Sequence, residues 1–295
     1  MLLVTDNLSK QYGDFRALDA LSLQIPAGEV FGLLGPNGSG KSTTIRLLLG
    51  MIRPTRGSAR IDGRDCWSDS VAVRRLVAYL PGELRLYDNL TGRQFLQFLA
   101  GLRGGNYGSD MTRLARRYDI DLDRAIANLS SGMKRKLALM SVMLPRVPLV
   151  ILDEPTNTLD PTMRDELLDQ LLEARSRGQT VLFSSHVLQE VERVCDRVGI
   201  LARGRLVHLQ PLAALRQGRQ ARVHLGAAPT RLPPPGIIVE EHHGSHWRLS
   251  CHDQVHELLA WLAEQQVVDL RIEPLGLENI YQAHHPAAAK EALAS

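Results

Sequence analysis

A glycine-rich run between residues 35 and 43 carries residue types that hold phosphate groups. It reads Gly-Pro-Asn-Gly-Ser-Gly-Lys-Ser-Thr and fits the pattern G-x-x-x-x-G-K-[ST]. Glycines let the backbone curl until successive N–H groups point at one anion. Lys41 can reach the β- and γ-phosphates of a nucleotide, and the Ser42 hydroxyl can ligate Mg²⁺. The predicted phosphate-binding residues are Gly35, Pro36, Asn37, Gly38, Ser39, Gly40, Lys41, Ser42 and Thr43.

The segments around this run have the pattern that the motif requires. Residues 30–34 are an apolar run that predicts a buried strand, and residues 45–49 continue as an amphipathic helix. The positive N-terminal end of that helix would add to the attraction for an anion. The alternative is a glycine-rich turn that only joins a strand to a helix. The complete motif between these elements favours the phosphate site.

A second apolar strand, residues 149–152, ends in two acids, Asp153 and Glu154. This pattern is typical of a central parallel strand whose carboxyl end lies at the ligand-binding edge of a sheet. There Asp153 can hold Mg²⁺ through a water or through Ser42, and Glu154 can orient or deprotonate an attacking water. The alternative is an acidic turn that caps the next helix.

Two further side chains are open to two interpretations each. His186 follows a predicted strand over residues 180–184, where it is either a helix cap or core histidine, or a group beside the γ-phosphate. Tyr12 lies in a turn upstream of the glycine-rich run. Its ring either stacks on a nucleotide base or packs over the neighbouring backbone.

Composition narrows the class of protein. The 295 residues allow a domain of about 200 residues with a smaller one beside it. The net charge is +3 with acids and bases interspersed, so we expect no nucleic-acid partner. Three cysteines far apart favour a reducing, cytoplasmic compartment over a disulfide framework or a zinc site. The N-terminus does not resemble a signal peptide and no apolar run suits a membrane helix, so any membrane role requires a partner.

The order of elements predicts an α/β protein with a small second part. Short strands over residues 2–8, 21–25 and 29–34 form an antiparallel region, and residues 84–148 read as a helical insert. Strands over 198–201 and 206–209 form a closing hairpin. We place the first domain at residues 1–215, a proline-rich linker at 216–235, a small α+β module at 236–285 and a flexible tail at 286–295.

Residues 129–136, Leu-Ser-Ser-Gly-Met-Lys-Arg-Lys, resemble the signature motif of ABC transporter ATPases, usually written LSGGQ. The resemblance covers residues 1 to about 210 in five ordered motifs. It implies a P-loop NTPase fold, with a RecA-like core, an antiparallel β subdomain and the helical insert. It also implies that ATP is hydrolysed with Mg²⁺, that Tyr12 stacks on adenine, that Asp153 and Glu154 are the Walker B acids, and that residues 158–160 with Asp160 are the D-loop. His186 would be the switch histidine.

The signature segment can bind an anion because Ser130 and the N–H groups near Gly132 open a helix. In this family that site serves the phosphate loop of a facing subunit, so the resemblance implies a head-to-tail homodimer or heterodimer. Two positions depart from the family pattern. Gly82 stands where the family has a glutamine, so Mg²⁺ sensing is weaker or the neighbouring Glu83 takes that role. In the signature itself, Ser131 and Met133 replace a glycine and the glutamine.

The resemblance also bears on the partner and the cargo. Residues 84–91 resemble the segment that leads to the groove for a separate transmembrane permease, which would hold the chain at the inner face of the membrane. The close of the small module, residues 273–281, resembles bacterial exporter ATPases for drug, antibiotic or sodium efflux. The alternatives are the motor of an importer and a non-transport ATPase acting on ribosomes or DNA. The histidine-rich tail, with His252 and His256 one helical turn apart, reads as a solvated face rather than a metal site.

Overall fold

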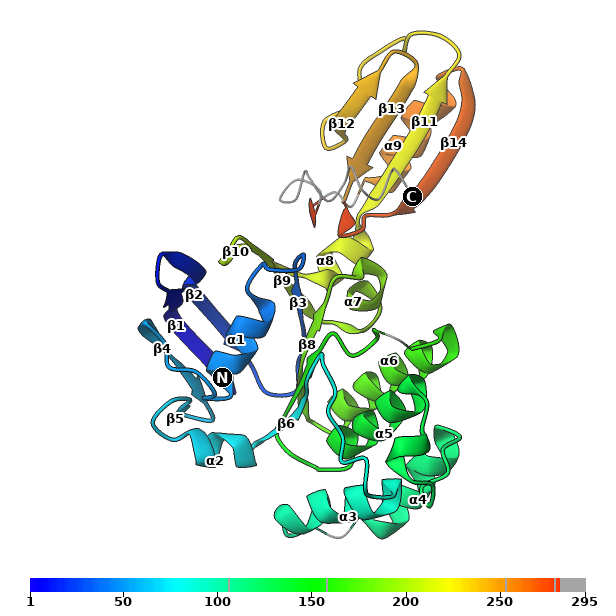
Figure 1. Ribbon diagram of the computed structural model, residues 1–295. Coiled ribbons are helices and arrows are strands. Elements are labelled where there is room, and N and C mark those ends of the chain that lie inside the picture. The colour runs from blue at the N-terminus through cyan, green and yellow to red at the C-terminus, as the bar shows by residue number, and fades with distance from the viewer. Residues whose placement is uncertain (106, 158, 253, 279, 282–295) are drawn as a thin grey trace. The chain divides into compact units, whose positions relative to one another are not determined.

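The strand that leads into the glycine-rich run lies inside a six-stranded sheet of order β10-β9-β3-β8-β7-β6 (Figure 1). The computed structural model describes residues 1–105, 107–157, 159–252, 254–278 and 280–281. In it, β3 (Val30–Leu34), β7 (Leu149–Asp153) and β8 (Thr180–Ser185) are parallel neighbours, and every residue of the three is buried. Burial on both faces explains why each reads as an unbroken apolar run. Their carboxyl ends meet at one edge of the sheet.

The other strands of this sheet are β6 (Val77–Leu80), β9 (Arg197–Ala202) and β10 (Arg205–Pro211). β6 pairs in parallel with β7, and β9 with β3. β9 and β10 are neighbours in the sheet and are joined by a short turn, which confirms the predicted hairpin. The sheet therefore carries a closing hairpin at one side and the strand before Gly82 at the other.

A second, antiparallel sheet packs over one face of the first through a helix. Its order is β2-β1-β4-β5, with bounds β1 (Leu3–Tyr12), β2 (Phe15–Ile25), β4 (Arg56–Ile61) and β5 (Arg64–Asp65). Helix α1 (Lys41–Leu48) lies between the two sheets in Figure 1. Ile45, Leu47 and Leu48 of α1 are buried in one core with residues of both sheets. This core fixes the helix whose first turn follows the phosphate loop.

The predicted helical insert is present, together with helices on the remaining face of the sheet. The bounds are α2 (Ser70–Arg75), α3 (Gly92–Leu102), α4 (Gly108–Arg117), a 3-10 turn η1 (Ile126–Asn128), α5 (Ser131–Met143), α6 (Pro161–Ser176) and α7 (Leu188–Val194). Helix α7 approaches β3 closely at Gly32, where a Cβ would lie 2.6 Å from Val191 Cγ1. A larger residue at Gly32 would therefore push α7 away from the sheet.

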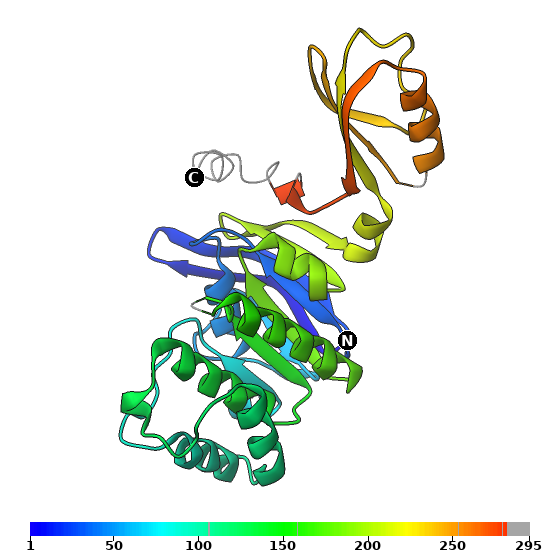
Figure 2. The same cartoon turned by 90° about the vertical axis from the view of Figure 1, so that its right-hand side faces the viewer.

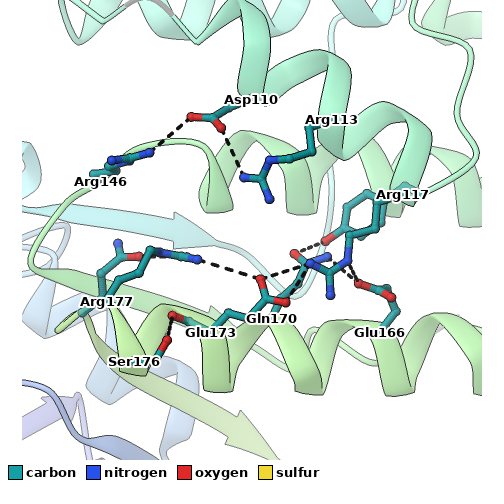
Figure 3. A network of polar contacts seen from close by, with 11 residues as sticks. Asp110, Arg113, Arg117, Arg146, Glu166, Gln170, Glu173, Ser176 and Arg177 are labelled. Atoms are coloured by element: carbon teal, nitrogen blue, oxygen red, sulfur yellow. Dashed lines mark hydrogen bonds and ion pairs between the residues drawn. The ribbon is translucent and has the colours of Figure 1, made fainter.

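Polar contacts tie the insert to the helix that follows the second acidic strand. Arg117, the last residue of α4, forms ion pairs with Glu166 and Glu173 of α6 (Figure 3). Next to it, the buried Tyr118 hydroxyl donates to Gln170 Oε1 at 2.5 Å. Because these groups come from both elements and are partly or fully buried, they hold α4 against α6 in a defined position.

The chain divides into two compact units, Met1–Gln210 and Pro211–Ser295. In the second unit a four-stranded antiparallel sheet has the order β12-β13-β11-β14, and α9 (Val255–Ala263) packs on one face of it (Figure 2, orange helix). The strand bounds are β11 (Arg219–Leu225), β12 (Ile238–His243), β13 (His246–Cys251) and β14 (Val267–Pro274), and a short helix α8 (Leu212–Gln217) precedes them. Trp261 of α9 and Trp247 of β13 lie in its core.

The predicted linker over residues 216–235 was wrong in its first half. Residues 219–225 form β11, which pairs with both β13 and β14 and is a central strand of the second sheet. Alternation of buried Ala221, Val223 and Leu225 with polar residues gives this strand its core face.

Part of the sequence analysis falls outside the described residues. These positions are residue 106 of the predicted insert, Thr158 of the D-loop, residues 253, 279 and 282–285 of the module and the tail at 286–295. Among the described residues, no helix is both long and apolar enough to cross a membrane. The three cysteines are free and buried.

Candidate functional site

The glycine-rich loop has a backbone that only glycine adopts readily. Gly38 and Gly40 have φ values of +78° and +111°, in the region that favours glycine because it has no Cβ. A Cβ on Gly40 would also lie 2.9 Å from the carbonyl oxygen of Ala17, a close approach of two backbone segments. Gly40 is the residue before α1, and no side chain caps this end of the helix. Its first N–H groups therefore add a positive field at the loop.

Lys41, Glu154 and His186 form one polar cluster at the carboxyl edge of the sheet. The buried Lys41 Nζ donates to the carbonyl oxygen of Gly35 at 2.6 Å and lies 3.1 Å from Glu154 Oε1. The other carboxylate oxygen, Glu154 Oε2, lies 3.1 Å from His186 Nδ1. The structure thus brings together three groups that were predicted to act together, although Lys41 precedes Glu154 by more than 100 residues and Glu154 precedes His186 by 32.

The Glu154 carboxyl group has a pKa below its ordinary value. Burial pushes this pKa upward, but hydrogen bonds from Asn157 and Lys41 and the charge of Lys41 outweigh burial. Glu154 also has a positive φ of +46° at the end of β7. A non-glycine residue in this region costs about 1–3 kcal/mol, which surrounding contacts must offset. Glu154 is therefore an ionised carboxylate held in a strained turn beside a lysine.

Asp153 is buried at the end of β7 and is oriented by a neighbouring strand. The Ser184 hydroxyl of β8 donates to Asp153 Oδ1 at 2.7 Å, and the Glu154 N–H donates to the same hydroxyl at 2.9 Å. One serine therefore fixes both acids. Gly82 lies beside them, since a Cβ there would be 3.9 Å from Asp153 Oδ2. Ser42, which is exposed, and Asp153, which is buried, are the two residues predicted to ligate a divalent cation, and both carry the oxygen atoms that such a cation prefers.

The sequence left helix capping open as an alternative role for the acidic turn and for His186. The observed first residues of α6 and α7 decide against that role. The residue that caps α6 is Asp160, whose side chain accepts from Met163 N at 2.9 Å. Glu154 does not have this role. Helix α7 follows Val187 without a side-chain cap, and His186 contacts Glu154 instead.

Arg135 is a buried residue of the site region to which the sequence analysis gave no role. Its guanidinium donates to four backbone carbonyls, those of Pro81, Gly82, Glu154 and Pro155, at 2.6–3.2 Å. Burial lowers its pKa, although the charges of Asp153 and Glu154 act in the opposite direction. Arg135 lies in α5, so it ties the signature helix to the acidic turn and to the segment after β6. The feature of the sequence that could have drawn attention to Arg135 is its place on the apolar face of this helix.

The signature residues lie at the start of α5. The Ser130 hydroxyl accepts from Met133 N at 3.3 Å as the helix cap, and a Cβ on Gly132 would meet nothing within 4 Å. This leaves the backbone around Gly132 open to a ligand. Among the described residues, no hydrogen bond or ion pair joins Ser130 or Gly132 to Lys41 or Glu154. Within one chain, the two predicted anion sites are therefore not joined.

Two further predicted residues are at the surface. Tyr12 ends β1 with an exposed ring, and Lys10 Nζ lies 4.9 Å from the ring centroid. The ring is therefore accessible to a planar ligand. Glu83 is exposed, while its neighbour Gly82 is the residue beside Asp153. In the second unit, His224 and His246 stack with ring centroids 4.3 Å apart. Within the described range, no cluster of three or more His, Cys, Asp or Glu side chains could hold a metal ion.

Comparisons with known proteins agree with this geometry. Residues 18–157 match the family model described as ABC transporter. The chain is 36% identical to the probable multidrug ABC transporter ATP-binding protein YbhF of Escherichia coli K12 over 68% of its length, and spans 35% of that protein. It is 33% identical to the linearmycin resistance ATP-binding protein LnrL of Bacillus subtilis, over 70% of this chain and 68% of LnrL. A solved structure of an ATP-binding subunit of an ABC transporter is 33% identical, with a TM-score of 0.69, over 73% of this chain and 92% of that one.

Proposed function

Because this chain belongs to the family of ABC transporter ATP-binding proteins, we propose that it hydrolyses ATP to power a bacterial exporter of drugs or antibiotics. The observation that carries the proposal is the cluster of Lys41, Glu154 and His186 next to the buried Asp153. The names of YbhF and LnrL, a multidrug and a linearmycin resistance protein, favour export over import. The exported compound is recognised by a separate transmembrane permease.

The residues of the loop and of the acidic turn suit ATP and Mg²⁺. The loop from Gly35 to Thr43 and the first N–H groups of α1 would hold the phosphates, and Lys41 would neutralise their charge. Ser42 and Asp153 would ligate Mg²⁺, which draws charge from the phosphate oxygens when it is bound. The exposed ring of Tyr12 would stack on adenine.

Glu154 would act on the water that attacks the terminal phosphate. Its ionised carboxylate can accept a proton or orient the water, and His186 at 3.1 Å can hold the carboxylate in position. Lys41 shares the same carboxylate and must exchange this contact for phosphate when a nucleotide is bound. We therefore assign the catalytic roles to Glu154, His186 and Lys41.

Two copies are required for a complete site. Ser130 and Gly132 form an anion site at the start of α5 that is not joined to the Lys41 cluster of the same chain. A head-to-tail dimer of ATP-binding subunits would place Ser130 and Gly132 of one copy, with Asp160 nearby, against the phosphates held by the other. ATP would then stabilise this dimer and hydrolysis would loosen it.

The permease would bind near the segment 84–91. Tyr87 is 55% exposed and makes an edge contact with Phe98, which is 48% exposed, at 6.0 Å between ring centroids. Exposed aromatic rings of this kind mark protein contacts. Through this contact the chain would sit at the cytoplasmic face of the membrane.

The direct test is ATP hydrolysis by the purified protein and by Glu154→Gln. The substitution keeps the shape and the Asn157 contact but removes the ionised carboxylate, so we expect hydrolysis to fall about 100-fold or more while ATP binding persists. Glu257→Gln is the matched control, because Glu257 is an exposed acid of α9 in the second unit, outside the cluster, and it should hydrolyse ATP like the unchanged protein. Full hydrolysis by Glu154→Gln would contradict the proposal.

A further inference from the structure

Among the described residues, no strand pairs with the outer edge of β14 in the second unit. β14 is the last strand in the order β12-β13-β11-β14, and β11 is its one neighbouring strand among the described residues. The strand is eight residues long, with Val268 63% and Leu270 38% exposed. Natural proteins blunt such edges with short strands, covers, bulges or charged residues, because their N–H and C=O groups template pairing with another chain. This edge is eight residues long and partly apolar, its charged residues have both signs, and its pairing with β11 shifts register at Val268.

One backbone donor of the strand is satisfied by a side chain. The Leu270 N–H donates to Asp269 Oδ1 at 3.0 Å. A side-chain acceptor substitutes for a carbonyl where no second strand supplies one. A second strand would offer that carbonyl and release the Asp269 carboxylate for another partner.

We propose that β14 pairs antiparallel with β14 of a second copy of this chain, around a twofold axis at Leu270. In this register Leu270 faces Leu270 of the second copy, and Val268 faces Ile272. Asp269 faces Arg271, and twofold symmetry creates this ion pair twice. The two sheets would join into one continuous sheet of eight strands.

The two faces of the strand suit this pairing. On one face Leu270 lies opposite Val223 of β11, a core residue under α9, so pairing extends the apolar side. On the other face Asp269 and Arg271 lie opposite His224 and Arg222. Arg271 also contacts Glu273 of its own strand, but a guanidinium has five donors and can hold two carboxylates.

Charges and strand overlap together favour the Leu270 register. Moving the axis to Asp269 would place the two Asp269 carboxylates opposite each other, and moving it to Arg271 would oppose two guanidinium groups. Like charges directly opposite destabilise a strand pair. An axis at Ile272 would also pair opposite charges, Arg271 with Glu273, but it would pair only residues 270–274, whereas the Leu270 axis pairs residues 267–273. The Leu270 axis therefore combines opposite charges with the longer overlap.

The other edge strand, β12, does not suit pairing with itself. Its middle residues are Glu240 and Glu241, and antiparallel self-pairing about that point would place acids of the two copies opposite each other. Pairing of β12 with β14 would be heterologous and would produce open chains instead of a closed dimer. A closed dimer through β14 is the arrangement that the charges favour.

Cysteine cross-linking of the full chain without nucleotide tests the register. Opposite residues have Cβ atoms about 4.5–5.5 Å apart, near what a disulfide spans, whereas residues displaced by four positions are roughly 13 Å apart. We expect Leu270→Cys to form a disulfide-linked dimer on mild oxidation. Val268→Cys and Ile272→Cys should each cross-link poorly alone but well when mixed. The native cysteines are buried, and the unchanged protein therefore gives the background level of cross-linking.

Equal yields from the three single variants, or no dimer of Leu270→Cys, would overturn the proposal. Because no nucleotide is present, this result is independent of ATP-driven association and of the proposed ATPase activity. Long polymers in place of dimers would also overturn it.

Charge exchange provides a second test by sedimentation velocity. Asp269→Arg and Arg271→Asp each turn both ion pairs into like-charge pairs, so each variant should associate about tenfold more weakly or worse. An equimolar mixture restores opposite charges between the two variants and should associate like the unchanged protein. A mixture that associates no better than either variant alone would contradict pairing in this register.

Discussion

At the scale of single residues, the sequence could predict that a lysine, an acid and a histidine lie at one edge of the sheet. A motif indicated Lys41, and Glu154 and His186 follow buried strands, which is where a parallel sheet gathers ligand-binding side chains. Position alone left the role of His186 open between two interpretations, and the family resemblance favoured one of them. Arg135 was not predicted because its contacts are with backbone carbonyls of residues far away in the sequence, and its place on the apolar face of a helix indicates burial without naming those partners.

Arg135 should be important for stability as well as for the geometry of the site. Arg135→Gln removes donors from up to four buried carbonyls, so we expect the free energy of unfolding to fall by about 2–4 kcal/mol and hydrolysis to fall with it. Lys134→Gln is the neighbouring control, because Lys134 makes one surface ion pair with Asp88 and should cost at most about 1 kcal/mol. Urea unfolding measures the free energy of unfolding of both variants. Equal losses would show that Arg135 has no special role.

The lowered pKa of Glu154 makes part of the stability depend on pH. Its ionised form is favoured in the folded state, so its stabilising effect is complete above the ordinary value of 4.5 and is lost as pH falls through the lower folded pKa. We expect the difference in Tm between the unchanged protein and Glu154→Gln to be constant near neutral pH and to shrink below about pH 4.5. Thermal unfolding from pH 7 to 3 measures it. A difference that stays the same throughout would contradict this assignment.

At the scale of elements, hydrophobic period predicted most helices and strands. Buried runs marked β3, β7 and β8, and three- and four-residue spacing marked the helices of the insert. β11 was missed because its alternation of Ala221, Val223 and Leu225 with polar residues is short and precedes a proline-rich stretch, which together read as a linker. Its position depends on pairing with β13 and β14, contacts that its own residues do not specify.

A comparison of two helix caps can separate the effect of Ser130 on stability from its effect on ATP hydrolysis. The Ser130 hydroxyl caps α5 and the Thr91 hydroxyl caps α3, so Ser130→Ala and Thr91→Ala should each destabilise the protein by about 1 kcal/mol. If Ser130 also binds phosphate across a dimer, only Ser130→Ala should lower ATP hydrolysis well beyond that effect. Thermal melts and ATPase rates of the two variants give the comparison. A similar loss of activity in both variants would mean that Ser130 acts only as a helix cap.

At the scale of the whole molecule, one chain carries one phosphate loop and one signature segment that are not joined to each other. The second unit adds the outer edge of β14, which no strand of the described part of the chain covers and whose charges are self-complementary about Leu270. ATP would control the first association, whereas the second requires no nucleotide. Neither association could be predicted from element patterns alone, because each depends on which groups remain without a partner after one chain has folded.

The composite nucleotide site is the central claim, and light scattering of one variant tests it most directly. Glu154→Gln should trap ATP, and adding Asp269→Arg in the same chain suppresses association through β14. We predict the mass of one chain without nucleotide and of two chains with saturating ATP and Mg²⁺. A mass of one chain with ATP bound, or no affinity for nucleotide, would contradict the account.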